Sequence, residues 1–397
     1  MMRSSALINK ETLAHICLHI GVTNTFLAQR IHIAEDTIAK WLAVDDTALP
    51  TLNQAKMLAK VLKVPFAGLY MSKECININQ LPNLRNLRTI PAGVAIDDSA
   101  LNLAIVDLIR ARDFLYTSEE ELGLVKVALS LPAISDTATS TEYAGHIRKF
   151  FGIELDAQFR FTSTRQFYLY VRGQIERKGI FIHCFTGVEV EAVRGIALYD
   201  ETNPIIGIND NDHYPAKTFS IIHELVHILK RQSTLCNDMH SSFAVQDEEV
   251  FCNAVAGEVL VPTDSLIAYF SAHTLSGISL DNIKIVADRF RVSREVIIRR
   301  LLDTGCISKD AYDTYSNEIR HSFEQEREAA RVARQEGRGE PIPRNISREA
   351  VDMNSTAICR ILLVGYGEGY FSKQDVSGLL GIKEKHIPKF IEEVAKW

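Results

Sequence analysis

The motif His223-Glu224-Leu225-Val226-His227 places two imidazoles and a carboxylate at a spacing that suits metal chemistry. Histidines four residues apart share one face of an α-helix, because the helix turns once every 3.6 residues. Their nitrogens can bind one Zn²⁺, and Glu224 at the edge of that face can accept a proton from a water that the metal activates. The surrounding apolar run predicts a helix over about residues 216–231. The motif therefore predicts a metal site with Glu224 as its catalytic base.

A catalytic zinc ion needs a third protein ligand and one open position. The downstream candidates are His240, Asp247, Glu248 and Glu249. Glu249 is favoured, because residues 249–260 predict a single helix on which Glu249 and Asn253 share a face. Asn253 is then expected to orient His223 through the ring nitrogen that does not bind metal. Residues 236–242 are polar and predict a loop between two antiparallel helices.

Two further side chains are candidates for stabilising the oxyanion that forms when a peptide bond is attacked. Tyr199 and His213 each lie at the end of a predicted strand or helix that faces the motif. Both can donate a hydrogen bond, which is what an oxyanion requires.

A small β-sheet is predicted directly before the histidine helix. Residues 180–185, 193–199 and 204–208 are β-rich and are separated by turn residues such as Thr186-Gly187. A small sheet followed by such a helix is the order found in zincin peptidases, in which an edge strand pairs with an extended substrate. Residues 193–199 are predicted to be that edge.

The N-terminal region predicts a bundle of short helices over residues 11–71, with helices at 11–20, 24–31, 34–42 and 51–62 and a last turn from Pro65 to Tyr70. This helix-turn-helix pattern resembles the Cro/repressor-type domain. Residues 1–80 hold 8 Lys/Arg and 6 Asp/Glu, and the presumed recognition helix begins with Glu35 and Asp36. DNA binding is therefore one possibility, beside protein docking and a purely structural role.

The predicted fold class is α+β, predominantly helical, with a small β-sheet zincin-like peptidase core between the N-terminal bundle and C-terminal helical modules. In the connector, residues 101–115 and 119–129 predict two helices. Residues 282–302 predict a second helix-turn-helix-like unit, which either packs on the peptidase or contacts nucleic acid. A charged helix (318–336), a linker (337–343) and a third such unit (372–390) follow. The predicted domains are 1–72, 73–165, 166–305 and 306–397.

Composition limits the class of protein. The chain has 397 residues, of which 46% are hydrophobic and 24% charged, and its net charge of −6 gives no support for a nucleic-acid-coating or membrane-surface protein. Its seven cysteines include no Cys-x-x-Cys pair, which predicts reduced thiols. Neither a signal peptide nor an apolar run of about 18 residues is evident. We therefore expect a cytoplasmic protein without a membrane partner.

Residues 219–230 (FSIIHELVHILK) and 249–262 (EVFCNAVAGEVLVP) resemble the ImmA/IrrE family of metallopeptidases. Residues 193–210 and the N-terminal bundle also resemble longer members. The resemblance implies His223, His227 and Glu249 as zinc ligands, a gluzincin-like set, with Glu224 as general base. It further implies a protein substrate, namely a helix-turn-helix repressor, and action with a neighbouring regulator or toxin/antitoxin component.

Two functions of different classes follow from this sequence. The first is a zinc endopeptidase that cleaves one or a few regulatory proteins. The second is a non-hydrolytic regulator or antitoxin that uses the same fold to bind a protein partner or DNA. The presence of Glu224 favours the first, because a binding protein has no need of a general base at this position.

Overall fold

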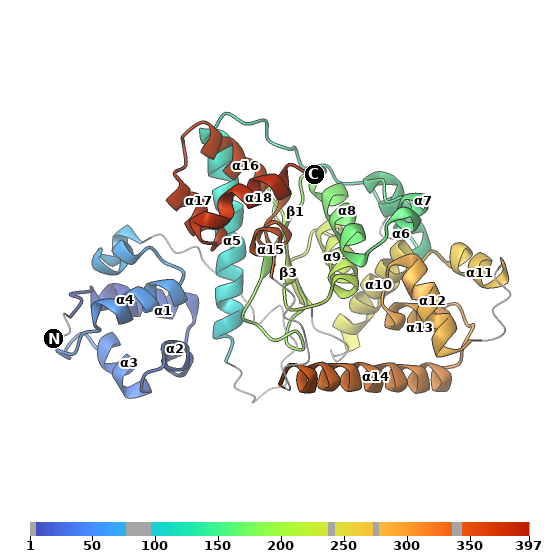
Figure 1. Cartoon of the computed structure of the whole chain (residues 1–397), viewed down its shortest axis with the longest axis horizontal. Coiled ribbons are helices and arrows are strands. Elements are labelled where there is room, and N and C mark those ends of the chain that lie inside the picture. Colours follow the sequence, from blue (N-terminus) through green and yellow to red (C-terminus); the bar gives the residue numbers. More distant parts are fainter. Residues whose placement is uncertain are drawn as a thin grey trace. The chain divides into compact units, whose positions relative to one another are not determined.

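The computed structural model describes residues 5–76, 97–135, 137–236, 243–272, 278–335 and 344–396. Within these residues the fold is predominantly helical α+β with one four-stranded sheet (Figure 1). The chain divides into two compact units, one of residues 1–114 with 185–193 and the other of residues 115–184 with 194–397. The predicted fold class is thus confirmed.

The first unit is a bundle of short helices around a core that includes Leu13, Leu27 and Trp41. Its caps explain where the helices begin: the Asn9 side chain accepts from the Thr12 N–H, and Thr51 forms a capping box with Gln54. Five helices lie close to the predicted positions, namely α1 (Lys10–Ile20), α2 (Asn24–Ile31), α3 (Glu35–Leu42), α4 (Leu52–Val61) and η1 (Phe66–Tyr70). A further short helix, η2 (Lys73–Cys75), was not predicted.

Helix α5 (Ser99–Glu121) begins in the first unit and ends in the second. The prediction of a separate helix over residues 119–129 was wrong, because Glu119 to Glu121 form the last turn of α5. Gly123 adopts a left-handed φ of 60°, and the N–H groups of Gly123 and Leu124 donate to the carbonyls of Glu120 and Glu119. These bonds satisfy the last carbonyls of α5 and end the helix.

The second unit is built around the sheet of β1 (Phe181–Phe185), β2 (Gly195–Leu198), β3 (Ile205–Asn209) and β4 (Thr234–Cys236). Its helices are α6 (Ser140–Phe151), α7 (Leu155–Arg160), α8 (Thr164–Glu176), α9 (Tyr214–Leu229), α10 (Phe243–Leu260), α11 (Thr263–Ala272), α12 (Leu280–Phe290), α13 (Arg294–Asp303), α14 (Lys309–Gln335), α15 (Ile346–Met353), α16 (Thr356–Gly367), α17 (Lys373–Leu380), η4 (Glu384–His386) and α18 (Ile387–Val394).

The strand order is β1-β3-β2-β4, so the prediction that residues 193–199 form an edge strand was wrong. Strand β2 is internal: it pairs antiparallel with β3 on one side and with β4 on the other. β4 was missed because three residues are too few to show a strand periodicity. Cys236, the last residue of β4, was assigned to the predicted loop 236–242. The rest of that loop, residues 237–242, lies outside the described residues, and so does the predicted linker 337–343.

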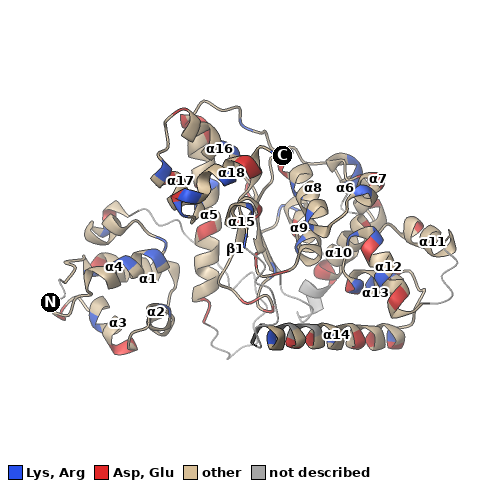
Figure 2. Cartoon of the chain, in the orientation of Figure 1, with Lys and Arg blue, Asp and Glu red and all other residues tan. Residues whose placement is uncertain are grey.

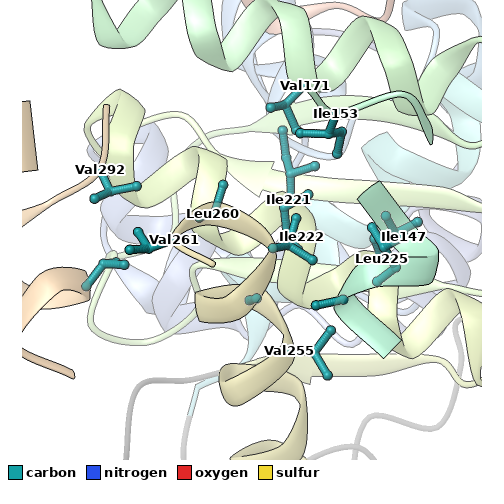
Figure 3. Packing of buried hydrophobic residues seen from close by; sticks show 14 of the residues in the cluster. Ile147, Ile153, Val171, Ile221, Ile222, Leu225, Val255, Leu260, Val261 and Val292 are labelled. Atoms are coloured by element: carbon teal, nitrogen blue, oxygen red, sulfur yellow. The ribbon is translucent and has the colours of Figure 1, made fainter. Parts of the chain in front are cut away.

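Helix α9 packs on β2 and β3 and also against α8 and α10, so it lies in the centre of the second unit. Its apolar residues Ile221, Ile222 and Leu225 are fully buried, and Figure 3 shows them beside Val255 and Leu260 of α10. Burial of such side chains contributes about 1.5–3 kcal/mol each, which fixes the position of α9. This packing leaves the motif on α9 little freedom to move.

Among the described residues, no single helix is both long and apolar enough to cross a membrane. A bent pair, Asp247–Leu260 with Thr263–Ala272, meets the length and composition criteria when the two helices are taken together.

The C-terminal module, which we define as α15 to α18, is joined to the start of α9 by the buried carboxylate of Asp352 on α15. The Arg165 Nε and the Tyr214 hydroxyl donate to Asp352 Oδ2 over 2.7 and 2.8 Å. The carbonyl of Asp352 also accepts from Arg172, whose guanidinium is 1% exposed. Tyr214 is the first residue of α9, so this network holds the end of the helix that carries the motif.

We predict that Asp352→Ala lowers the free energy of unfolding by about 3–5 kcal/mol, because it removes a buried carboxylate and leaves the partly buried Arg165 guanidinium and the Tyr214 hydroxyl without their partner. The matched control is Glu349→Ala on the same helix, which removes a solvent-exposed ion pair with Arg344 and should have a much smaller effect. Urea denaturation measures both. Equal losses in the two variants would show that the Asp352 network does not anchor the module.

Candidate metal centre

The histidine motif lies on the buried face of α9. His223 and His227 are 5% and 0% exposed, and Glu224 is fully buried. Polar side chains are found in an apolar core only where other groups satisfy them, because their unpaired burial costs several kcal/mol. The motif therefore needs polar partners, and α10 and the sheet supply them.

Glu249 on α10 lies between the two imidazoles. Its Oε2 is 3.1 Å from His223 Nε2, and its Oε1 is 3.4 Å from His227 Nε2. The two Nε2 atoms are themselves 3.2 Å apart. One donor atom from each of the three residues lies within 4.8 Å of the others, which is the geometry needed to hold a metal ion.

Asn253 sets the protonation of His223. Its Oδ1 lies 3.0 Å from His223 Nδ1, so the imidazole donates its Nδ1 proton there and its Nε2 keeps a lone pair. That lone pair faces the Glu249 carboxylate and the second Nε2, and all of these are electron-rich atoms. A cation is the group that satisfies three such donors at once, so these residues fit a divalent metal ion.

The electrostatics of Glu249 agree with this description. Burial raises the pKa of its carboxyl, but in the metal-free site hydrogen bonds from His223 and His227, and the charge of these imidazoles when they are protonated, more than offset burial and hold the pKa well below its usual value. The carboxylate is therefore ionised at neutral pH, as a metal ligand must be.

Glu224 extends toward β2 and β4. The Thr234 hydroxyl of β4 is 3.4 Å from Glu224 Oε2. A Cβ atom added to Gly195 on β2 would lie 2.8 Å from both Cγ and Cδ of Glu224. Only glycine gives this carboxylate its space, and the sequence analysis missed Gly195. A glycine inside a β-rich run was the available signal, because it often marks a close approach.

A cavity of about 400 Å³ opens beside the centre. His223, Glu224 and Asn253 line it on one side, and residues of α13 and α14 line it on another. The side chain of Glu224 is thus buried in the protein but reaches a space where a substrate can lie. The cavity lies within the second unit.

The other candidates from the sequence are not part of the His223–His227–Glu249 cluster. His213 lines the cavity, and its Nδ1 is 2.9 Å from Asp212 Oδ1. Tyr199 packs against the core and is not among the residues that line the cavity. Glu248 forms an ion pair with Lys230 over 2.7 Å, and Asp247 is exposed. His240 lies outside the described residues.

Two buried histidines, a carboxylate between them and a second carboxylate beside a cavity make up the kind of site that a metallopeptidase uses. Residues 175–302 match the family model described as the IrrE N-terminal-like domain, a peptidase family. This part of the chain, which contains α9 and α10, belongs to the ImmA/IrrE family. No curated protein matched the chain.

We predict that His223→Ala and His227→Ala purify with well below one metal ion per chain, because each removes a donor atom. Asn253→Ala should retain the site but bind metal about 10- to 100-fold more weakly. Metal content by mass spectrometry and competition with a chelator measure these effects, and His146→Ala on α6 serves as an exposed-histidine control. Full metal content in His223→Ala or His227→Ala would show that the substituted histidine is not a metal ligand.

For Gly195→Ala we predict a loss of about 1–3 kcal/mol in the free energy of unfolding, because the new methyl group overlaps the Glu224 side chain. In a Glu224→Ala background the same change should cost far less, since the overlapping atoms are gone. Gly173→Ala is the control, because an added Cβ there meets nothing within 4 Å. Additive effects of the two substitutions would contradict the steric argument.

Proposed function

We propose that the protein is a zinc-dependent endopeptidase that cleaves a specific regulatory protein, namely a repressor of the helix-turn-helix class. The observation that carries this proposal is the convergence of His223, His227 and Glu249 beside Glu224 at the cavity. The first three residues would hold the metal and Glu224 would act as the base.

Zinc suits this set of two nitrogens and one oxygen, and when bound it would supply Lewis-acid polarisation of the scissile carbonyl and acidify a water molecule. Asn253 keeps the His223 tautomer that presents Nε2 to the ion. Tight packing of α9 and α10 keeps the donor atoms in place without rearrangement. The protein thus contributes a preorganised set of ligands.

Glu224 would move the protons of the reaction. It takes a proton from the water as the water oxygen bonds to the scissile carbonyl carbon. It then gives this proton to the amide nitrogen as the C–N bond breaks, which releases an amine and a carboxylic acid. Burial of the Glu224 side chain and its position between Gly195 and Thr234 restrict it to orientations that face the cavity.

A regulatory substrate is supported by the elements outside the matched domain. The first unit and the C-terminal module are folded parts that an unselective protease does not need. In the proposed domain 1–72, α3 begins with exposed Glu35 and Asp36, which would repel DNA phosphates. We therefore propose that this domain docks a protein partner.

The test is to express the wild type and Glu224→Gln together with the regulator encoded beside this protein. The amide keeps the size of the side chain but cannot accept the proton, so Glu224→Gln should bind zinc fully and yield no product band. Glu248→Gln, whose carboxylate pairs with Lys230 outside the cavity, should cleave like the wild type. Cleavage by zinc-loaded Glu224→Gln would refute its assignment as the base. Identical patterns without cleavage would favour a binding protein.

A further inference from the structure

The cavity beside the metal centre has a wall that comes from α14. Tyr312, Ser316, Ile319, Arg320 and Phe323 line the same space as His223 and Glu224. Their spacing of three and four residues places them on one face of the helix. Any peptide that reaches the catalytic residues through this space passes along that face of α14.

Helix α14 is held in place by hydrogen bonds to neighbouring elements. Glu295 on α13 accepts from the Tyr312 hydroxyl over 2.9 Å and from the Ser316 hydroxyl over 3.3 Å. The Tyr315 hydroxyl donates to the carbonyl of Ile278 over 2.7 Å, and Ile319 is 2% exposed. Burial, with Glu295 adding to it, raises the pKa of Tyr312 to about 12, so its hydroxyl stays protonated and keeps donating. The wall is therefore a fixed part of the cavity.

The match to the peptidase family ends at residue 302, whereas α14 begins at Lys309. The residues that hold the metal and the proposed base thus lie inside the matched domain, and the opposite wall lies outside it. A wall outside the matched domain can differ without changing the chemistry. This arrangement is expected where an added element sets specificity.

Phe323 gives this wall an apolar surface. It is 38% exposed, and its ring contacts the His213 ring, with centroids 6.4 Å apart, and the Arg294 guanidinium at 4.7 Å. On the catalytic side Phe219 lines the cavity one turn before His223, and their ring centroids are also 6.4 Å apart. A large apolar side chain of a substrate can bury surface against both phenyl rings.

Arg320 gives the wall a charge that is available for a ligand. The other guanidinium groups on the lining are paired: Arg194 with Asp212 over 2.7 Å, Arg299 with Asp303 over 3.1 Å, and Arg300 with Glu258. Arg320 is exposed and forms no ion pair with another described residue. Acidic and basic residues alternate along α14 (Figure 2), and among its described charged side chains Arg320 is the one that lines the cavity. A carboxylate of the substrate can pair with the Arg320 guanidinium.

We propose that α14 forms the specificity wall of the peptidase cavity, where Phe323 receives a bulky apolar side chain and Arg320 a neighbouring Asp or Glu of the substrate. The proposal rests on the proposed peptidase function and goes beyond it by naming the class of sequence that is cleaved. Arg320 and Phe323 act here in substrate binding and take no part in proton transfer.

The experiment uses the full zinc-loaded chain and a set of internally quenched twelve-residue peptides that vary two adjacent positions over Phe, Leu, Ala, Asp, Glu and Lys. We expect the wild type to cleave peptides that pair Phe or Leu with Asp or Glu with a kcat/KM at least about tenfold above those with Ala or Lys, equivalent to about 1.4 kcal/mol. Arg320→Glu should reverse the preference between Glu and Lys. Phe323→Ala should remove the preference for Phe and Leu.

Two controls on the same helix match these changes. Arg331→Glu makes the same charge change, and Val332→Ala truncates a residue as exposed as Phe323, yet neither residue lines the cavity. Both should keep the wild-type preferences. The Glu224→Gln protein supplies a second readout, in which fluorescence polarisation measures binding of the same peptides without cleavage.

The outcomes separate this inference from the function that it rests on. Cleavage without the expected preferences, or preferences that Arg320→Glu and Phe323→Ala leave unchanged, would overturn the specificity wall while leaving the peptidase intact. Selective binding to Glu224→Gln with no cleavage by the wild type would support the wall and overturn the peptidase function. If the peptides are neither bound selectively nor cleaved, the specificity wall is overturned, whatever the activity on other proteins.

Discussion

The central constraint in this molecule is the close approach of three electron-rich atoms inside an apolar core. The Nε2 atoms of His223 and His227 and the carboxylate of Glu249 lie within about 3.5 Å of one another. The hydrogen bond to Asn253 keeps the proton of neutral His223 on Nδ1, so that its Nε2 faces the other two groups with a lone pair. While both imidazoles are neutral and no cation is bound, such an arrangement is repulsive at a depth where water screens little. The surrounding helices must therefore hold the donors against this repulsion until an ion balances it.

The packing of α9 provides that holding force. A helix whose apolar residues are buried on the sheet, on α8 and on α10 cannot rotate its histidines away without exposing Ile221, Ile222 and Leu225 to water. Asp352 joins the C-terminal module to the first turn of the same helix through Tyr214. Stability and function are thus linked, because contacts far along the chain position the residues that would carry the chemistry.

Local spacing made part of this site predictable. The i, i+4 relation placed His223 and His227 on one face of a helix, and the same relation placed Glu249 and Asn253 together on the next helix. Three short strands and the helices of the N-terminal bundle were also predicted close to their observed bounds. In each case the signal lies within a few residues of the element itself, which is where periodicity and capping act.

Features that depend on contacts between distant segments were not predictable in this way. β4 exists because its three residues pair with β2, and that pairing made β2 internal rather than an edge. The end of α5 depends on the left-handed Gly123, which a run of three glutamates obscured. Gly195 matters because the Glu224 side chain, distant in sequence, lies against it. Each of these follows from tertiary structure that no window of the sequence contains.

The arrangement of the cavity separates two requirements that a selective peptidase must meet. Hydrolysis demands fixed distances, and the residues proposed for it lie on α9, which packs on the sheet, and on α10, which packs against α9. Selectivity demands a surface that can change, and α14 offers the exposed side chains of Arg320 and Phe323 at the cavity while Glu295 anchors the helix through Tyr312 and Ser316. Arg320 and Phe323 belong neither to the hydrophobic core around α9 nor to the residues proposed to hold the metal. A chain built in this way can acquire a new substrate without rebuilding its metal centre.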